Sequence, residues 1–120
     1  MDERLEKALD FSNYMVTLNN QKRLLIEKFY QDIIFYYKGA QFTVNKELLC
    51  FCDMLCQRDQ DNTVLIDDNN MPTYIDSIDE FLEIALDIYF KASNNFLNSY
   101  NSLKKNRSIE NLVELWVEEF

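Results

Sequence analysis

Residues 77–103, SIDEFLEIALDIYFKASNNFLNSYNSL, carry the clearest periodic signal in the chain and decide its expected fold. Ser77 followed by Glu80 fits a capping box, in which the two side chains satisfy free backbone N–H groups at a helix start. Residues that can face a core then recur in alternating steps of four and three: Ile78, Leu82, Ala85, Tyr89, Ala92, Phe96, Ser99 and Leu103. This spacing predicts a long amphipathic helix from residue 78 to about residue 105.

A second long helix is predicted for the start of the chain, from residue 2 to about residue 31. Its apolar positions also fall at helical spacing: Ala8, Phe11, Met15, Leu18, Leu25 and Phe29. Because both long helices carry apolar stripes, and the segments between them contain turn signals, the chain can return on itself. We therefore expect an antiparallel pair of long helices that dominates the domain.

Two β-hairpins are predicted between the long helices. In IIFYYKGAQFTV, residues 33–44, β-branched and aromatic residues flank Lys38 and Gly39, and a glycine supplies the positive φ that a tight turn needs. The expected strands are residues 33–37 and 41–44. In TVLIDDNNMPTYI, residues 63–75, two apolar runs flank a polar centre, and Pro72 limits ladder bonding by the second run.

Two shorter helices complete the expected fold. Asn45 can cap a helix from residue 46 to about residue 57, and Ser108 can cap a last helix from residue 109 to about residue 119. The expected fold class is α+β and mainly helical, with two long antiparallel helices, two small β-hairpins and a short middle helix. We expect a single domain over residues 1–107 and a C-terminal amphipathic acidic helix or tail over residues 108–120.

The order hairpin, cap, helix occurs twice in this prediction. FYYKGAQFTVNKELLCFCDML and VLIDDNNMPTYIDSIDEFLEIAL both follow it. The echo could reflect a duplicated unit that presents two similar surfaces, but hairpin followed by helix is a common local solution, and we favour that explanation. No functional prediction depends on it.

The residue types present exclude much of enzyme chemistry. The chain has no histidine, which removes histidine-dependent triads and imidazole ligands. Cys50, Cys52 and Cys56 point to diverging faces of a helix and are expected to be buried small hydrophobes rather than zinc ligands. The acids at residues 59–70 fail the EF-hand pattern, because Val64 and Asn70 stand where glycine and glutamate are needed. We expect no metal, no cofactor and no enzymatic activity.

Charge and hydropathy point to a protein partner. The net charge is −9, and residues 59–90 contain nine Asp or Glu residues and no Lys or Arg, which disfavours direct binding to nucleic acid or to a membrane surface. No run approaches the roughly 18 apolar residues of a membrane span, and the first ten residues lack a signal-peptide pattern. The odd, clustered cysteines suit a reducing compartment.

Three stretches resemble small uncharacterised proteins of T4-like marine myophages, of the cyanophage type. They are LEKALDFSNYMVTLNNQK, VLIDDNNMPTYIDSIDEFL and LKKNRSIENLVEL, and the resemblance covers most of the chain. It implies a phage protein that acts in the host cytoplasm, and it brings no activity with it.

These observations favour a non-enzymatic phage protein that binds a host or phage protein as an adaptor or modulator. The alternative is a structural or scaffold component of phage head assembly, whose helical seam serves self-association. A hydrolase that uses carboxylates alone is a third, weaker reading. A homodimer is expected, because long helices on so small a core leave an apolar seam uncovered.

The C-terminal residues are the predicted partner-binding site. They are Leu112, Leu115, Trp116 and Phe120, set among glutamates. The segment can fold back and dock on the domain, or it can act as a portable anchor with Trp116 in a partner's groove. The second reading resembles, in character only, the tails that join T4-like phage proteins to the sliding clamp.

Overall fold

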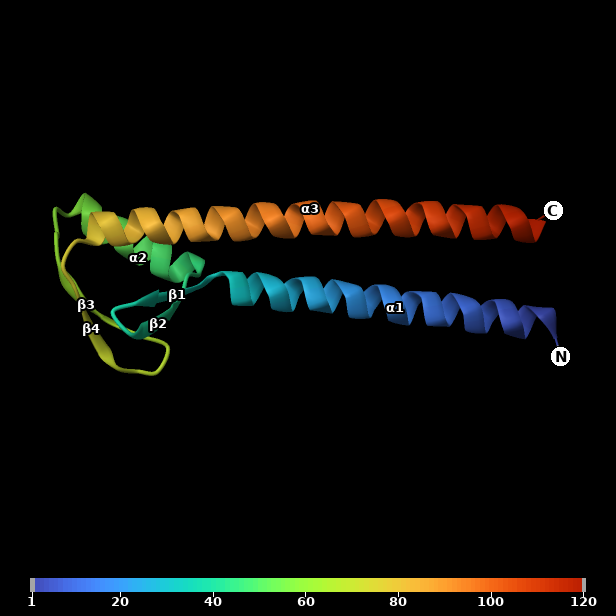
Figure 1. Cartoon of the computed structure of the whole chain (residues 1–120), viewed down its shortest axis with the longest axis horizontal. Helices are drawn as coiled ribbons and strands as arrows, with labels where there is room; N and C mark the ends of the chain where they lie inside the picture. The colour runs from blue at the N-terminus through green and yellow to red at the C-terminus, as the bar shows by residue number, and fades with distance from the viewer. Residues whose placement is uncertain (1, 120) are drawn as a thin grey trace. The chain divides into compact units, whose positions relative to one another are not determined.

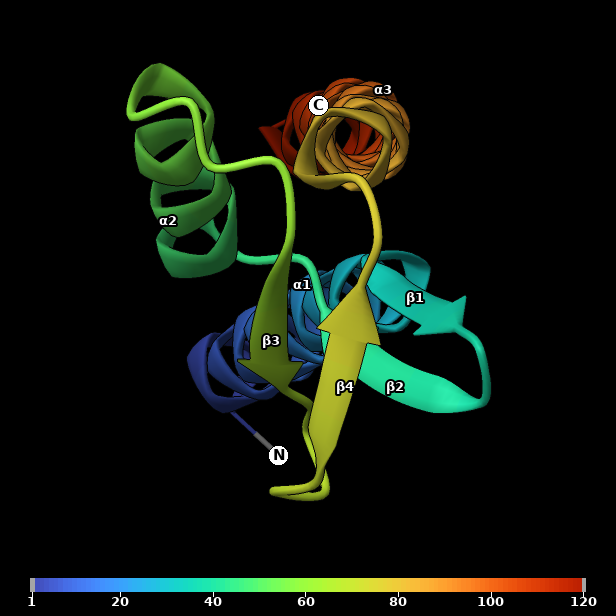
Figure 2. The ribbon, with the colours of Figure 1, turned by 90° about the vertical axis from the view of Figure 1, so that its left-hand side faces the viewer.

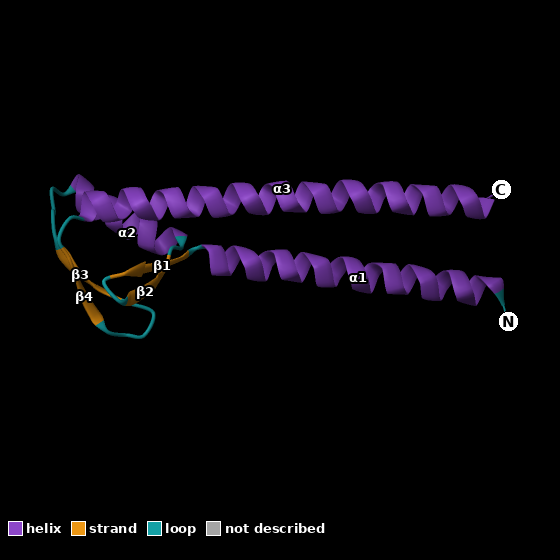
Figure 3. Cartoon of the chain, viewed as in Figure 1, coloured by secondary structure: helices purple, strands orange, loops and turns teal. Residues whose placement is uncertain are grey.

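The computed structural model describes the backbone of residues 2–119 and the side chains of residues 2–105. Its elements follow in the order α1 (Glu3–Asp32), β1 (Ile34–Tyr37), β2 (Ala40–Thr43), α2 (Lys46–Gln57), β3 (Thr63–Ile66), β4 (Pro72–Ile75) and α3 (Ile78–Glu119), as Figures 1 and 3 show. The strands form two separate antiparallel pairs, β1 with β2 and β3 with β4. The predicted fold class, α+β and mainly helical with two hairpins and a short middle helix, is confirmed.

The chain divides into two units, residues 29–95 and a helical unit of residues 1–28 with 96–120. Every side chain buried within the described part lies in the unit of residues 29–95. There, α2 and the first turns of α3 form one layer, and the two hairpins form the other (Figure 2). Of the two long helices, α1 contains no buried residue, whereas the first turns of α3 contribute Ile78, Phe81 and Ala85 to the core.

Phe81 of α3 is the centre of this core. Its ring lies 5.3 Å from that of Phe35, 5.5 Å from that of Tyr37 and 5.4 Å from that of Phe42, measured between centroids. The rings meet in tilted or edge-on arrangements, which aromatic pairs prefer. Leu65 and Ile75 of the second hairpin join the same cluster, so one helix residue gathers both hairpins.

Both hairpins lead through two connecting residues into a capped helix. The side chain of Asn45 accepts a hydrogen bond from the backbone N–H of Leu48 at 2.8 Å, and that of Ser77 accepts one from Glu80 at 3.3 Å. Each bond satisfies one of the free N–H groups at a helix start. The repeated order of hairpin, cap and helix is therefore present in the structure.

Two contacts join the hairpins to each other. Asp68, in the β3–β4 turn, accepts hydrogen bonds from the hydroxyl of Thr43 at 2.7 Å, the backbone N–H of Thr43 at 3.2 Å and the side chain of Gln41 at 3.3 Å. Its own N–H donates to the carbonyl of Gln41 at 2.8 Å. Elsewhere, Nζ of Lys38 lies 2.8 Å from a carboxylate oxygen of Asp76. Asp68 and Asp76 therefore help to hold the two hairpins together.

The β1–β2 turn uses positive φ at two positions. Lys38 has φ 47° and Gly39 has φ 81°, as the two central residues of a tight hairpin turn require. Gly39 adopts a positive φ at no steric cost. Lys38 pays a steric cost for the same conformation because it has a Cβ atom. Its ion pair with Asp76 and its place over the Tyr37 ring, 5.2 Å from the centroid, offset part of that cost.

Some of the apolar positions predicted to be buried along the two long helices are exposed in the structure. In α1, Leu18, Leu25 and Phe29 are half-buried as expected, but Ala8, Phe11 and Met15 are exposed. In α3 the half-buried position is Tyr100 rather than Ser99. A straight α-helix with 3.6 residues per turn drifts against a repeat of alternating fours and threes, which accounts for the second difference.

The prediction of a separate last helix that begins after Ser108 is wrong, because α3 continues without a break to Glu119. Residues 103–108, LKKNRS, contain no glycine or proline to end a helix. An asparagine or serine inside a helix costs only about 0.5 kcal/mol relative to alanine, so continuation is cheaper than a turn. With no turn, residues 109–119 cannot fold back as a distinct element. The division into residues 1–107 and 108–120 stays a prediction.

Candidate partner-binding surface

One face of the β3–β4 hairpin is apolar and open to solvent. Val64 and Ile66 of β3 are 54% and 61% exposed, and Tyr74 of β4 is 53% exposed. Val64 stands opposite Tyr74, and Ile66 stands opposite Pro72, so the four side chains share one side of the hairpin. We call these four residues the outer hairpin face.

The opposite face of the same hairpin fixes this orientation. Leu65 and Ile75 are buried, in the cluster around Phe81. Because neighbouring residues of a strand point to opposite faces, burial of Leu65 forces Val64 and Ile66 outward. The packing of the core therefore determines which side chains form the outer hairpin face. These side chains are apolar although they are exposed. Exposed apolar patches commonly mark interaction sites.

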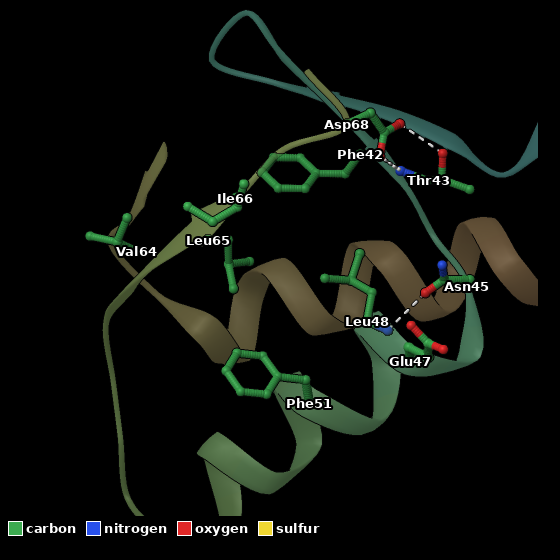
Figure 4. A pocket seen from close by; sticks show the side chains of 10 residues that line it. All are labelled: Phe42, Thr43, Asn45, Glu47, Leu48, Phe51, Val64, Leu65, Ile66 and Asp68. Atoms are coloured by element: carbon green, nitrogen blue, oxygen red, sulfur yellow. Dashed lines mark hydrogen bonds between the residues drawn. The ribbon is translucent and has the colours of Figure 1, made fainter. Parts of the chain in front are cut away.

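A groove of about 390 Å³ borders β3 (Figure 4). Its walls come from β2, the first two turns of α2, β3 and the turn after it. The lining residues are Phe42, Thr43, Asn45, Glu47, Leu48, Phe51, Val64, Leu65, Ile66 and Asp68. In Figure 4, Leu65 points from β3 toward the Leu48 and Phe51 side chains of α2. The groove and the outer hairpin face share Val64 and Ile66, so they form one continuous surface.

The charges of the groove are all negative. Among the described residues, Glu47 and Asp68 are the charged ones that line the groove, and none of the lining residues is Lys or Arg. Asp68 is occupied by its bonds to β2, whereas Glu47, in the first turn of α2, is exposed. An incoming cation would therefore meet Glu47 as the available carboxylate.

A smaller cavity of about 290 Å³ lies elsewhere in the same unit, lined by Phe29, Tyr30, Ile33, Asn45, Lys46, Glu47 and Tyr89. Its aromatic residues contact one another, with the Phe29 and Tyr89 rings 6.1 Å apart. Its charges are mixed, because Lys46 stands beside Glu47. It carries no strand edge and no exposed aliphatic row, and we assign it no role.

The cysteines have the properties of packing residues. Burial raises the pKa of Cys52 to about 11, and a hydrogen bond to Asp79, together with burial, raises the pKa of Cys56 to about 11. Thiols with such pKa values are poor nucleophiles at neutral pH. The prediction of buried small hydrophobes holds for Cys52, holds in part for half-buried Cys56, and is wrong for exposed Cys50.

The described residues offer neither a metal site nor a membrane-spanning helix. They contain no group of three or more Cys, Asp or Glu side chains placed to hold a metal ion. Among the same residues, no helix combines the length and the apolar character needed to cross a membrane.

The C-terminal residues predicted to bind a partner lie outside the described side chains. The backbone of Leu112, Leu115 and Trp116 belongs to α3, and Phe120 lies beyond the described residues. Their role stays a prediction. The outer hairpin face was not predicted, although its residues Val64, Ile66 and Tyr74 alternate in the sequence with core residues. Alternation alone does not tell which of two apolar faces turns inward.

Comparisons with models of known protein families, with curated proteins and with solved structures gave no match to this chain.

Proposed function

We propose that this chain is a non-enzymatic phage protein that binds a host or phage protein as an adaptor or modulator. The observation that carries the proposal is the outer hairpin face, an apolar surface that continues into a groove on the unit of residues 29–95. The phage setting rests on the resemblance to T4-like marine myophage proteins. The partner is a protein because the surface offers apolar side chains and carboxylates, and no basic residue for phosphate.

The size of the surface limits the expected affinity. Full burial of a Val or Ile side chain is worth about 1.5–3 kcal/mol. Val64, Ile66 and Tyr74 are about half exposed, so each gains a fraction of that, and association itself costs several kcal/mol. A micromolar dissociation constant corresponds to about −8 kcal/mol. We therefore expect binding through this surface to be micromolar or weaker unless a second contact, such as the C-terminal segment, adds to it.

The acidic surroundings favour a partner with a basic rim. Residues 59–90, which include the whole second hairpin, contain no Lys or Arg. Complementary charge raises association rates and rejects partners of like charge more than it adds affinity. Modulation of such a partner in the host cytoplasm is the role that these features support.

Site-specific photo-crosslinking tests the proposal. A photoreactive amino acid is placed at Ile66 in one protein and at Leu24 of α1 in another, since both residues are more than half exposed. In lysate of phage-infected bacteria, one protein should crosslink to position 66 and not to position 24. That protein, once identified and purified, should bind the purified chain. Equal crosslinking at both positions, or binding that vanishes on purification, contradicts the proposal.

A specific observation favours the alternative, a scaffold component that self-associates. Leu5, Leu9 and Val16 share one face of α1 by the helical step of 100°, and all are at least half exposed. Residues 1–30 carry five acids and five bases, so this helix escapes the repulsion expected of a chain with net charge −9. We propose this row as the surface of the expected homodimer. Sedimentation at tens of micromolar should give a dimer mass for the unaltered chain and a monomer mass for Val16→Glu.

A further inference from the structure

We infer that β3 accepts an extended peptide segment as a third strand, and that this segment carries apolar side chains at alternate positions and a Lys or Arg beside Glu47. The inference deepens the proposed function and rests on it, since it names the chemistry of the partner at the same surface. Strand addition to an open sheet edge is a common mode of peptide recognition.

The pairing of the hairpin leaves one side of β3 open. Asp67 donates its backbone N–H to the carbonyl of Met71 at 2.9 Å, which makes these two residues a hydrogen-bonded pair of the ladder. Hydrogen-bonded and non-hydrogen-bonded pairs alternate along antiparallel strands, so Leu65 bonds across to Thr73, while Val64 and Ile66 do not bond to β4. The N–H and C=O groups of Val64 and Ile66 therefore point to the free edge of β3.

Two other edges of the hairpins are closed by specific residues. On β4, Pro72 stands in the non-hydrogen-bonded pair with Ile66, so its missing N–H interrupts the outer edge of that strand. On β2, the outward carbonyl of Gln41 and the outward N–H of Thr43 are both bonded to Asp68. Proline and covering contacts are the usual protections of a strand edge. The β3 edge, by contrast, borders the groove.

The groove accommodates side chains of an added strand. Successive side chains of such a strand would point alternately to the two faces of the sheet. Those on the inner face would enter the groove between Leu65, Leu48 and Phe51 (Figure 4). Those on the outer face would extend the row formed by Val64 and Ile66. A segment with apolar residues at alternate positions therefore has a place for each of them.

The acidic residues of the groove predict where the bound peptide carries its Lys or Arg. The groove runs from Val64 and Phe51 to Glu47 and Asp68, so its acidic groups lie at one end (Figure 4). A Lys or Arg at that end of the peptide would reach Glu47, because Asp68, the other carboxylate that lines the groove, is already bonded to β2. A second copy of this chain is a poorer occupant, since it would set Asp67 and Asp68 of each β3 end against an equally acidic surface.

A designed peptide gives a direct test with the full chain. The probe is the fluorescently labelled heptapeptide Lys-Thr-Val-Thr-Val-Thr-Lys amide, in which the lysine and valine side chains share one face of an extended strand, and its binding is followed by fluorescence anisotropy. The first matched control carries N-methyl groups on the amides that would bond to β3, which removes donors without changing side chains or charge. The second replaces both lysines with glutamate. We expect the N-methylated peptide to bind at least about fivefold more weakly and the acidic peptide to bind more weakly still.

Two protein variants locate the contact. Val64→Pro removes an N–H on the free edge without touching the ladder to β4, as Pro72 shows for the other strand. Val64→Thr keeps the N–H and the β-branch. The proline variant should lose peptide binding and the threonine variant should keep most of it. Far-UV circular dichroism checks that both are folded, and if Val64→Pro is not, the N-methylated peptide on the unaltered chain decides.

The outcomes separate this inference from the proposed function. No binding of the probe, or equal binding of the N-methylated probe, overturns strand addition. Self-association of the chain through β3, detected as a Val64→Pro-sensitive dimer that excludes the peptide, overturns it as well. In each case a crosslinked partner at position 66 would still support a protein-binding role, through side chains instead of the strand edge.

Discussion

Asp68 shows how one turn residue organises this fold. Its carboxylate reaches across to the end of β2 and accepts three hydrogen bonds, two of them from Thr43. Asp67 beside it is buried and accepts the backbone N–H groups of Asn69 and Met71, which shapes the β3–β4 turn. One aspartate thus builds the turn, and the next holds it against the first hairpin.

We predict that Asp68→Ala lowers the unfolding free energy by about 1–2 kcal/mol, because charge-assisted bonds at an exposed site lie at the low end of their range. The matched control is Asp61→Ala, an exposed acid for which no side-chain hydrogen bond is found. It should change stability by less than about 0.5 kcal/mol. Urea unfolding of both variants makes the comparison. Equal effects would show that the Asp68 contacts contribute nothing specific.

The thiols give a second prediction at this scale. Cys52 and Cys56 keep their protons to a pKa of about 11 in the folded chain, above the ordinary value of 9.0. Proton binding that is tighter in the folded state stabilises it below pH 9, and that stabilisation is lost as pH rises from 9 to about 11. At pH 8, a maleimide should modify exposed Cys50 first. The urea midpoint should fall between pH 8 and pH 11, and fall less in a Cys52→Ala, Cys56→Ala double variant. Equal modification of all three cysteines would contradict the burial argument.

Among the elements, the first turns of α3 matter most for stability, because Phe81 joins both hairpins. Phe81→Ala should cost about 3–5 kcal/mol, the usual range for loss of a buried phenylalanine. Phe90→Ala is the control on the same helix, since Phe90 is 57% exposed, and it should cost less than about 1 kcal/mol. Chemical unfolding followed by circular dichroism measures both. Comparable losses would mean that the core is not centred on Phe81.

The elements were predictable from sequence where local chemistry decides them. The two hairpins, the cap at Asn45 and the start of α3 at Ile78 all follow from turn residues, β-branched runs and capping side chains within a few positions. What depends on distant partners was not predictable. The packing of Phe81 against Phe35 and Phe42 brings together residues far apart in the sequence, and it centres the core where the first turns of α3 meet the hairpins.

The candidate site was not predictable from the sequence either, because it also depends on contacts between distant residues. Both faces of β3 are apolar, so only the burial of Leu65 shows which one is left outside. The free edge of β3 depends on the pairing with β4, which the positions of Asp67 and Met71 fix. The acids of this region looked like solvent-facing charges, although two of them bond to backbone. A sequence pattern gives the residue types, whereas exposure and edge pairing are properties of the folded unit.

At the scale of the whole molecule, three surfaces are candidates for binding a partner or a second copy of the chain. They are the outer hairpin face with its groove, the row Leu5, Leu9 and Val16 of α1, and the C-terminal residues 108–120. They make different demands on the chain. The first requires the folded unit of residues 29–95, the second requires two copies, and the third requires a continuous peptide. The three surfaces share no residue, so each can be altered by substitutions of its own.

The central claim, that the outer hairpin face binds the partner, is tested most directly by calorimetric titration of the purified partner. Val64→Glu is compared with Val16→Glu, because the two valines have nearly equal exposure, 54% and 56%, and receive the same substitution. A third protein lacks residues 108–120. The account predicts at least tenfold weaker binding for Val64→Glu and a change below twofold for Val16→Glu. Unchanged binding of Val64→Glu, with loss of binding only in the truncated chain, would contradict it and assign the partner to the C-terminal residues.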